Sequence, residues 1–433
     1  MATTDSLPGE LIDIIFSNVT AHDLAQLSRT CKRLNRLAEP HLWTDIEFHH
    51  PSVHRLSDTT QPLPMVPASC RFYHWGTYSG QWKAERLFEA LLIFLSEDTN
   101  RLRRLCARVE SICTTVRSKN DIWQLLPYFT NLQAIELHGD YRYFDETEHT
   151  SFDVAAPTLS KLRYAKLIGH VPVAVAAWIL ESGIDLERLE LGMLDRGIGS
   201  KSTMGDDILR LPHDIYSPAD QPTYGRLQGW AVIPRPLSGF LPRRDNGACS
   251  LKLPRLRHLH LCQPSQSNLS ARMVSYFWST SAEVAAHLDW EQILLASSQT
   301  LETLVVEQRI GIEYGDGAVD DAEGFLRSDQ EGLGSKRLMD VLEKVLTEEA
   351  LPALKRVHLK GIVVGSNARG KPIGDVPGGH FMRLLEKMNV ECDARLGEGC
   401  WFDGEDGATA SSEWEVSTED GDDPVEEELL ARI

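Results

Sequence analysis

The chain has 433 residues, of which 42% are hydrophobic and 25% are charged, and its formal net charge at pH 7 is -19. This composition predicts a globular protein with room for two or three domains. The acidic charge argues against nucleic acid or an anionic membrane as a partner, because both attract a basic face. No apolar run approaches the roughly 18 residues of a membrane span, so no transmembrane segment is expected.

Two features predict a location in the cytoplasm, the nucleus or both. Asp5 and Glu10 interrupt the start of the chain, where a signal peptide would be continuously apolar. The eight cysteines are scattered without a Cys-x-x-Cys pair, which is typical of reduced thiols. Cys31, Cys106 and Cys113 lie in apolar contexts, and we expect all three in the core.

The first predicted helix begins near residue 8. Ser6 can cap it, and Pro8 fits the first turn, where its missing amide hydrogen has no intrahelical partner. Leu11, Ile14 and Ile15 then recur at helical spacing, which indicates an amphipathic helix.

Two further short helices follow, over Ala21–Arg29 and Lys32–Ala38, and we expect Pro40 to end the third. Three helices of this length cannot bury much apolar surface among themselves. Some of their apolar residues should therefore face another protein.

The apolar pattern of this segment resembles an F-box. A Leu-Pro start, a Leu/Leu/Cys/Leu middle and a Pro-x-Leu-Trp end stand at the family's spacing, and Gly9 replaces the bulkier polar residue usual there. The resemblance implies binding to the adaptor subunit of a cullin-RING ubiquitin ligase and, through it, to the cullin scaffold. The alternative is an ordinary helical cap whose leucines all point into one core. The positions that match the family's adaptor-binding motif are Leu7, Pro8, Leu11, Ile15, Leu24, Leu27, Leu34, Leu42 and Trp43.

A different pattern recurs farther along the chain. Six segments share the spacing Leu-x-x-Leu-x-Leu or a close variant, which is the strand signature of leucine-rich repeats. Helical segments lie between them, so we expect parallel strands with helices on one side and a concave binding surface on the other. The predicted strand segments begin at Leu132, Leu162, Leu186, Leu256, Leu301 and Leu354, with a further candidate at Val109. The predicted helices are Pro172–Glu181, Ala282–Ser297, Leu338–Leu346 and Phe381–Met388.

The repeat is irregular. Successive strand segments begin 30, 24, 70, 45 and 53 residues apart, whereas common leucine-rich repeats have a period of about 20 to 29 residues. The asparagine or cysteine expected after each strand is also missing. A generic α/β domain with unrelated amphipathic strands is the alternative. We favour an irregular horseshoe, because leucine-rich repeats commonly follow F-boxes.

The predicted fold class is α/β, with a three-helix F-box followed by an irregular leucine-rich-repeat-like solenoid, long insertions and a disordered acidic tail. The chain thus resembles F-box receptors of the fungal leucine-rich-repeat type. The insertions Gly192–Leu251 and Gly311–Gly334 are either functional or mobile loops. Asp403–Ile433 holds twelve acidic residues and one basic residue, so we expect it to be solvated. The predicted domains are residues 1–48 (F-box), 49–100 (linker and connecting helix), 101–400 (repeats) and 401–433 (tail).

Motifs for catalysis are weak. Gly197–Ser202 lacks the glycine that precedes the lysine of a phosphate-binding loop. His50, His54, Cys70 and His74 have the chemistry of zinc ligands, but structural zinc sites usually space their cysteines more closely. We therefore predict a protein that is not an enzyme and needs no cofactor or metal.

Three classes of function remain. The first is a substrate receptor that docks an adaptor through the F-box and an unidentified protein target through the repeats. The second is an F-box scaffold that acts outside ubiquitin ligases, and the third is an enzyme with an unrecognised site. For a receptor, the x positions of the strands should face away from the core, and their His and Arg content predicts an acidic or phosphorylated target segment. The predicted target-binding residues are Arg188, Arg257, His258, His260, Arg356, His358 and Lys360.

Overall fold

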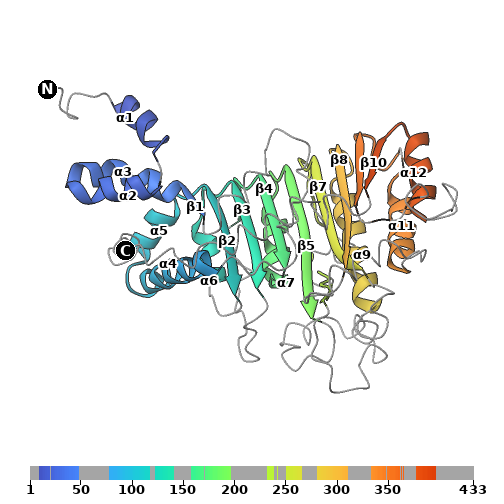
Figure 1. Ribbon diagram of the computed structural model, residues 1–433, viewed down its shortest axis with the longest axis horizontal. Coiled ribbons are helices and arrows are strands. Elements are labelled where there is room, and N and C mark those ends of the chain that lie inside the picture. Colours follow the sequence, from blue (N-terminus) through green and yellow to red (C-terminus); the bar gives the residue numbers. More distant parts are fainter. Residues whose placement is uncertain are drawn as a thin grey trace, which may run out of the picture.

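Nine parallel strands stand side by side in one sheet, and helices cover one of its faces (Figure 1). The computed structural model describes residues 9–19, 21–47, 78–117, 122–140, 158–169, 171–196, 232–237, 241, 250–265, 280–310, 333–347, 349–360, 362, 364 and 377–395. In sheet order the parallel strands are β1 (Asp45–Glu47), β2 (Ser111–Arg117), β3 (Ala134–Asp140), β4 (Tyr164–Gly169), β5 (Arg188–Arg196), β7 (His258–Ser265), β8 (Thr303–Ile310), β9 (Arg356–Lys360) and β10 (Glu391–Arg395). A further strand, β6 (Val232–Pro234), pairs antiparallel with the end of β5.

Helices alternate with these strands. The N-terminal helices are α1 (Gly9–Phe16), α2 (Ala21–Thr30) and α3 (Lys32–Thr44). The first part of the sheet is accompanied by α4 (Tyr78–Glu97), α5 (Thr99–Cys106) and α6 (Ile122–Leu125), which runs into a 3-10 turn at Leu126–Tyr128. The crossover helices farther along are α7 (Val173–Ser182), α9 (Thr280–Ala296), α11 (Leu333–Val345) and α12 (Pro377–Lys387). None of the described helices is long and apolar enough to cross a membrane.

The repeated leucine spacing predicted the main part of this sheet correctly. Each predicted segment, including the candidate at Val109, contains or directly precedes a parallel strand, and the four predicted crossover helices form. Serial strands and helices of this kind are those of a leucine-rich-repeat-like α/β solenoid. The spacing did not predict β1, β6 and β10, which lack a Leu-x-Leu pair.

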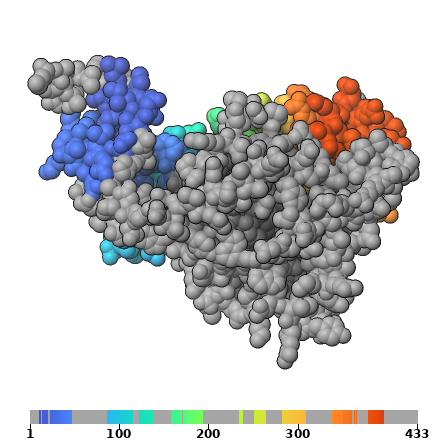
Figure 2. All heavy atoms as spheres, viewed as in Figure 1, coloured from blue at the N-terminus to red at the C-terminus, as the bar shows by residue number. Residues whose placement is uncertain are grey.

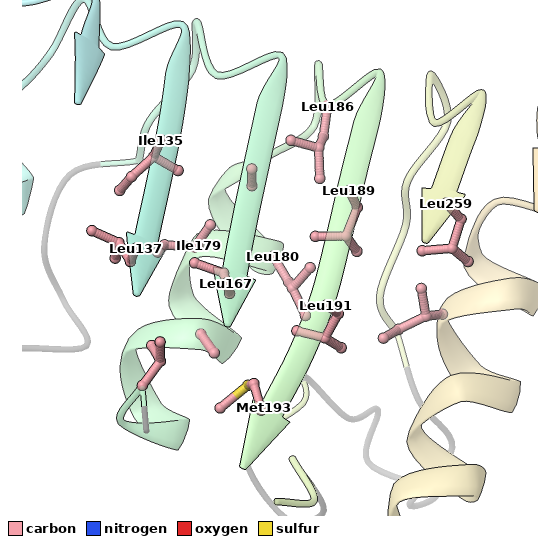
Figure 3. Close-up of a cluster of buried hydrophobic side chains, with 14 of the residues drawn as sticks. Ile135, Leu137, Leu167, Ile179, Leu180, Leu186, Leu189, Leu191, Met193 and Leu259 are labelled. Carbon is pink, nitrogen blue, oxygen red and sulfur yellow. The ribbon is translucent and has the colours of Figure 1, made fainter. Parts of the chain in front are cut away.

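The core lies between the sheet and its helices. Alternate strand residues point into it, so that Ile135, Leu189 and Leu259 lie in one register row and are fully buried. Ile179 and Leu180 of α7 pack against this layer from the helical side (Figure 3). The same cluster continues from Ile46 in β1 to Val390 before β10 without interruption. Each repeat therefore buries its apolar face against its neighbours.

The N-terminal helices join the solenoid without a linker. Helix α3 runs directly into β1, which pairs in register with β2. Ile46 is buried in the solenoid core, and the partly buried Trp43 packs against it. A Glu39–Arg108 ion pair, with 2.9 Å between Oε2 and Nη1, also links α3 to the segment before β2. The N-terminal helices and the last repeat lie at opposite ends of the molecule (Figure 2).

Two details of this region differ from the predictions. Pro40 does not end α3, which continues to Thr44, and the Thr44 hydroxyl donates a 2.9 Å hydrogen bond to the Pro40 carbonyl. The helix is retained because its last turn places Leu42 and Trp43 against two apolar clusters. Cys106 and Cys113 are buried as expected, but Cys31 is exposed as the N-cap of α3.

Several predictions fall outside the described residues. These include the acidic tail, the four candidate zinc ligands and most of the two insertions. Within the described ranges, no group of three or more His, Cys, Asp or Glu side chains could hold a metal ion.

Candidate functional site

The three N-terminal helices form a small cluster with one uncovered side. Ile12 and Phe16 of α1 point inward against Leu24 and Ala38. Most of the other leucines of α2 and α3 are half-buried around this cluster. On the outer side of α1, three large apolar residues are exposed, namely Leu11 (46%), Ile14 (60%) and Ile15 (48%). They lie together because residues three and four apart share one side of a helix.

The second candidate surface is the strand face, which lies opposite the helices. Two rows of side chains cross it in register. The first row consists of Tyr164, Arg188, His258, Thr303, Arg356 and Glu391. The second row consists of Glu136, Lys166, Glu190, His260, Val305, His358 and Asp393. Charged and histidine side chains thus line up across strands that are far apart in the sequence.

Much of the second row is buried. Glu136, Lys166, Glu190 and His260 each retain 6% exposure or less. The Lys166 ammonium lies 2.8 Å from Glu136 Oε1, and His260 Nε2 lies 2.9 Å from Glu307 Oε2 of β8. Buried charges of this kind need partners, because desolvation strongly penalises an isolated ion. These pairs therefore belong to the structure of the sheet rather than to an open surface.

The side chains of the first row range from buried to exposed. Arg188 donates to Glu190 Oε1 at 2.6 Å, and its guanidinium carbon stands 5.4 Å from the centre of the Tyr164 ring. Burial raises the pKa of Tyr164 well above its ordinary value, and the Glu190 carboxylate adds to this shift. Burial, together with the Arg188 guanidinium, lowers the pKa of His258. His258 is therefore neutral at pH 7, and the cations of this row are its arginines.

The exposed cations lie where the strands begin. The residues directly before four neighbouring strands form a further row. The backbone N–H of Lys355 donates to the carbonyl of Glu302. Glu302 donates in the same way to Arg257, and Arg257 to Glu187. The Arg257 side chain is 63% exposed, and the Lys355 side chain is 71% exposed. Lys355 donates a 2.7 Å hydrogen bond to Glu302, and this bond lowers the pKa of that carboxyl. We call Arg257, Lys355 and the half-exposed Arg356 the basic edge.

Comparison with known proteins agrees with this arrangement. A family model described as F-box-like matches residues 4–49. The chain carries an F-box-like domain. A distant homologue is the F-box/LRR-repeat protein 4 of Bos taurus, which is 26% identical over 196 residues, covering 43% of this chain and 29% of that protein. This chain therefore matches less than a third of the length of that curated relative.

The residues that match the F-box motif are not equivalent in the structure. Leu7 and Pro8 lie outside the described residues. Leu11 and Ile15 are exposed on α1. By contrast, Leu24 is buried within the F-box-like domain, and Trp43 packs against the solenoid. The half-buried leucines of the set are Leu27, Leu34 and Leu42.

The motif match did not select the most exposed apolar residue of the domain. Ile14 lies between Leu11 and Ile15 on the outer side of α1 and is more exposed than either. The signal was available, because the three residues stand at helical spacing and Ile12 and Phe16 fill the opposite side.

The predicted target-binding residues divide between the rows. Arg188, His258 and Arg356 stand in the first row, and His260 and His358 stand in the second. Arg257 precedes β7 on the basic edge, and Lys360 pairs in register with Glu307 at the end of β9. Six of the seven predicted residues thus lie on the strand face, and Arg257 lies before β7 at its edge. The sequence did not distinguish the buried His260 from the exposed Arg257.

Proposed function

We propose that this protein is the substrate-recognition subunit of a Skp-cullin-F-box ubiquitin ligase. The observation that carries the proposal is the exposed apolar side of α1, formed by Leu11, Ile14 and Ile15 on the F-box-like domain. Apolar residues gathered on so small a bundle favour a protein partner, because leaving them in water costs free energy. In this proposal the partner is the adaptor subunit, which links the chain to the cullin scaffold.

The proposed contribution of the chain is proximity, not chemistry. The F-box-like domain holds the adaptor, and the solenoid holds a protein target near the ubiquitin-carrying enzyme, which raises the effective concentration of the target's lysines. The chain itself needs no catalytic residue, cofactor or metal for this role. The five cysteines that the structure describes are free thiols, which fits a place in the cytoplasm or nucleus.

The direct junction between α3 and β1 supports this role. Ile46 is buried in the solenoid core and the partly buried Trp43 packs against that core, so the two proposed binding regions are joined by packed secondary structure. A receptor of this kind presents its target at a defined distance and angle from the adaptor, which is the condition for a high effective concentration.

The adaptor site can be tested by placing charge on α1. Leu11→Glu combined with Ile15→Glu should abolish co-purification of the adaptor, because the interface would have to bury two carboxylates without partners. The matched control is Ile93→Glu on α4, where an isoleucine is 52% exposed at a distance from α1. Undiminished adaptor recovery with the double variant would contradict the assignment, and so would equal loss with the control.

We further propose that the target binds at the basic edge and the first row of the strand face. The exposed Arg257 and the half-exposed Arg356, which is paired with Glu391, are the cations that an acidic or phosphorylated segment would meet first in this proposal. Arg188 and His258 lie beside them in the sheet, and Lys360 ends the same face. The burial of His260 and the partial burial of His358 give them a supporting role, in which they hold neighbouring strands through Glu307 and Asp393.

Charge reversal tests this target site. Arg257→Glu with Arg356→Glu should weaken capture of the target by about tenfold or more while leaving adaptor binding unchanged. The double variant Arg103→Glu with Arg104→Glu on α5 is the matched control, because both arginines are exposed and the change in net charge is the same. Equal target recovery from the wild type and the Arg257/Arg356 variant would place recognition elsewhere.

A further inference from the structure

The junction between the N-terminal helices and the solenoid is basic, although the chain as a whole has a net charge of -19. Residues 24–38 and 99–109 together hold eight arginines and lysines and no aspartate or glutamate. The first stretch covers most of α2 and the first half of α3, and the second stretch covers α5. A local concentration of one sign of charge attracts ligands of the opposite sign.

Two contacts bring these stretches together. Glu39 of α3 is paired with Arg108, which directly follows α5, at 2.9 Å. The backbone N–H of Glu110 donates a 2.8 Å hydrogen bond to the carbonyl of Thr44, the last residue of α3. The end of α3 therefore lies beside the end of α5 (Figure 1).

Two cations of α3 lie on the side that meets α5. With 3.6 residues per turn, Lys32 and Arg36 fall within about 60° of Glu39 around the helix. Both are exposed, and they stand about 10 Å and 5 Å from Glu39 along the helix axis. Because Glu39 is bonded to Arg108, this side of α3 is oriented toward α5.

Helix α5 adds a third cation. Arg104 stands four residues before Arg108, and Ala107 between them keeps helical backbone angles, so that Arg104 lies on the same side. It is exposed. Arg103 is also exposed but lies about 140° from Arg108 around the helix. We call Lys32, Arg36 and Arg104 the junction patch. Among the residues that the structure describes, no ion pair of these three side chains is found.

Nearby acidic side chains are engaged elsewhere. Glu39 forms the junction ion pair, and Glu110 accepts a 3.1 Å hydrogen bond from Gln133 Nε2. Asp98 caps α5 by accepting a 3.0 Å hydrogen bond from a backbone N–H of its first turn. The exposed Glu97 ends α4 and lies near the start of α5, at the opposite end from the junction. The junction patch therefore keeps a positive charge.

The patch also carries a local cost that a ligand would remove. Lys32 stands in the first turn of α3, where the helix dipole favours acidic residues, and that turn contains none. A bound carboxylate would offset this unfavourable interaction and would accept charge-assisted hydrogen bonds from Arg36 and Arg104.

The size of the patch favours a short acidic segment. Its cations lie within about 15 Å along the two helices, which is the length of about five residues of extended chain. A nucleic acid or an anionic membrane would extend past the patch and meet the acidic remainder of the protein. A short run of aspartates or glutamates would not.

We propose that the junction patch binds an acidic segment of another protein, with consecutive carboxylates held between α3 and α5 by Lys32, Arg36 and Arg104. This surface is separate from the apolar side of α1 and from the basic edge. The inference does not depend on the proposed function.

Fluorescence anisotropy with a labelled poly-glutamate peptide tests the proposal. The full-length Arg257→Glu/Arg356→Glu variant serves as the background, because it removes the basic edge as a second binding site. This background should bind the peptide, and adding Lys32→Glu with Arg36→Glu should weaken binding on the order of tenfold. The matched control adds Arg103→Glu with Lys344→Glu, which changes the net charge equally at two exposed positions outside the patch. No binding to the background, or equal loss with the control, would overturn the proposal.

Cross-linking of the same background with a carbodiimide locates the peptide without changing the patch, because the reagent joins a carboxylate only to an amine that it contacts. The expected product, mapped by mass spectrometry, links the peptide to Lys32. Cross-links to other lysines without Lys32 would contradict the proposal. Sedimentation with phosphatidylserine vesicles distinguishes a membrane ligand, and vesicle binding that Lys32→Glu/Arg36→Glu abolishes would also overturn it.

Discussion

The F-box-like domain and the solenoid have very different cores. The domain encloses four buried apolar residues, Ile12, Phe16, Leu24 and Ala38. The solenoid encloses one continuous cluster that runs through every repeat from β1 to β10. A bundle with so small a core gains much of its stability from neighbours, whereas the solenoid supplies its own. The difference explains why the domain joins the solenoid through β1 and exposes apolar residues on its other side.

The largest expected effect separates the two cores directly. Leu259→Ala should lower the free energy of unfolding by about 4 kcal/mol, because the side chain is fully buried in the middle of the sheet. Leu24→Ala should cost only about 2 kcal/mol, since the small bundle can relax around the gap. Urea unfolding of both variants measures the two values. Equal losses would show that the domain and the solenoid are one core.

The next prediction concerns the buried ion pair of the strand face. Lys166→Met should cost about 3 kcal/mol, because it leaves the buried Glu136 carboxylate without its lysine. Adding Glu136→Leu should recover most of that loss, since an apolar pair of similar volume needs no charge compensation. A double-mutant cycle by urea unfolding provides the test. Additive losses would mean that the two charges do not depend on each other.

Acid should also weaken the solenoid through a buried histidine. Burial lowers the pKa of His287 to about 3, and the nearby Arg337 guanidinium contributes to the shift. A depressed folded-state pKa gives stability that is present above the unfolded-state pKa of 6.5 and is lost as the pH falls toward 3. Between pH 7.5 and pH 5 the loss should be about 2 kcal/mol. His287→Gln should show a shallower pH dependence, and an unchanged slope would contradict this account.

The smallest expected effect is one of thiol reactivity. A backbone hydrogen bond from Leu34 lowers the pKa of the exposed Cys31 thiol in the F-box-like domain. In the solenoid, burial raises the pKa of Cys106 to about 12. Alkylation at pH 7, mapped by mass spectrometry, should therefore modify Cys31 well before Cys106, which should stay unmodified until the protein unfolds. Early modification of Cys106 would indicate that the junction between α5 and β2 opens locally.

The parallel sheet could be predicted because its signal is periodic. Leu189 and Leu259 occupy the same position of the repeated leucine spacing, and in the sheet they are register partners. The spacing therefore predicts both the strands and their alignment. The short strand β1 and the polar strand β10 carry no such signal and form because β2 and β9 offer unpaired edges. The continuation of α3 through Pro40 depends on tertiary contacts of Trp43, which a local rule does not include.

The candidate sites could be predicted only in part. Alternation along a strand places Glu190 and His260 on the strand side of the sheet, but it does not specify what else lies over each position, and it does not apply to Arg257, which stands one residue before β7. For this reason the sequence did not separate the buried second row from the basic edge. On α1 the helical spacing of the apolar residues indicates the exposed side, and the exposed Ile14 was not among the predicted adaptor-binding residues.

The central claim is that one chain joins an adaptor to a target for ubiquitin transfer. Its most direct test is affinity purification from cells treated with a proteasome inhibitor, with the wild type beside the Leu11→Glu/Ile15→Glu and Arg257→Glu/Arg356→Glu variants. The account predicts that the wild type recovers the adaptor and a ubiquitylated partner, that the α1 variant recovers the partner without ubiquitin or adaptor, and that the basic-edge variant recovers the adaptor alone. A partner that carries the same ubiquitin modification with the wild type and the α1 variant would contradict it.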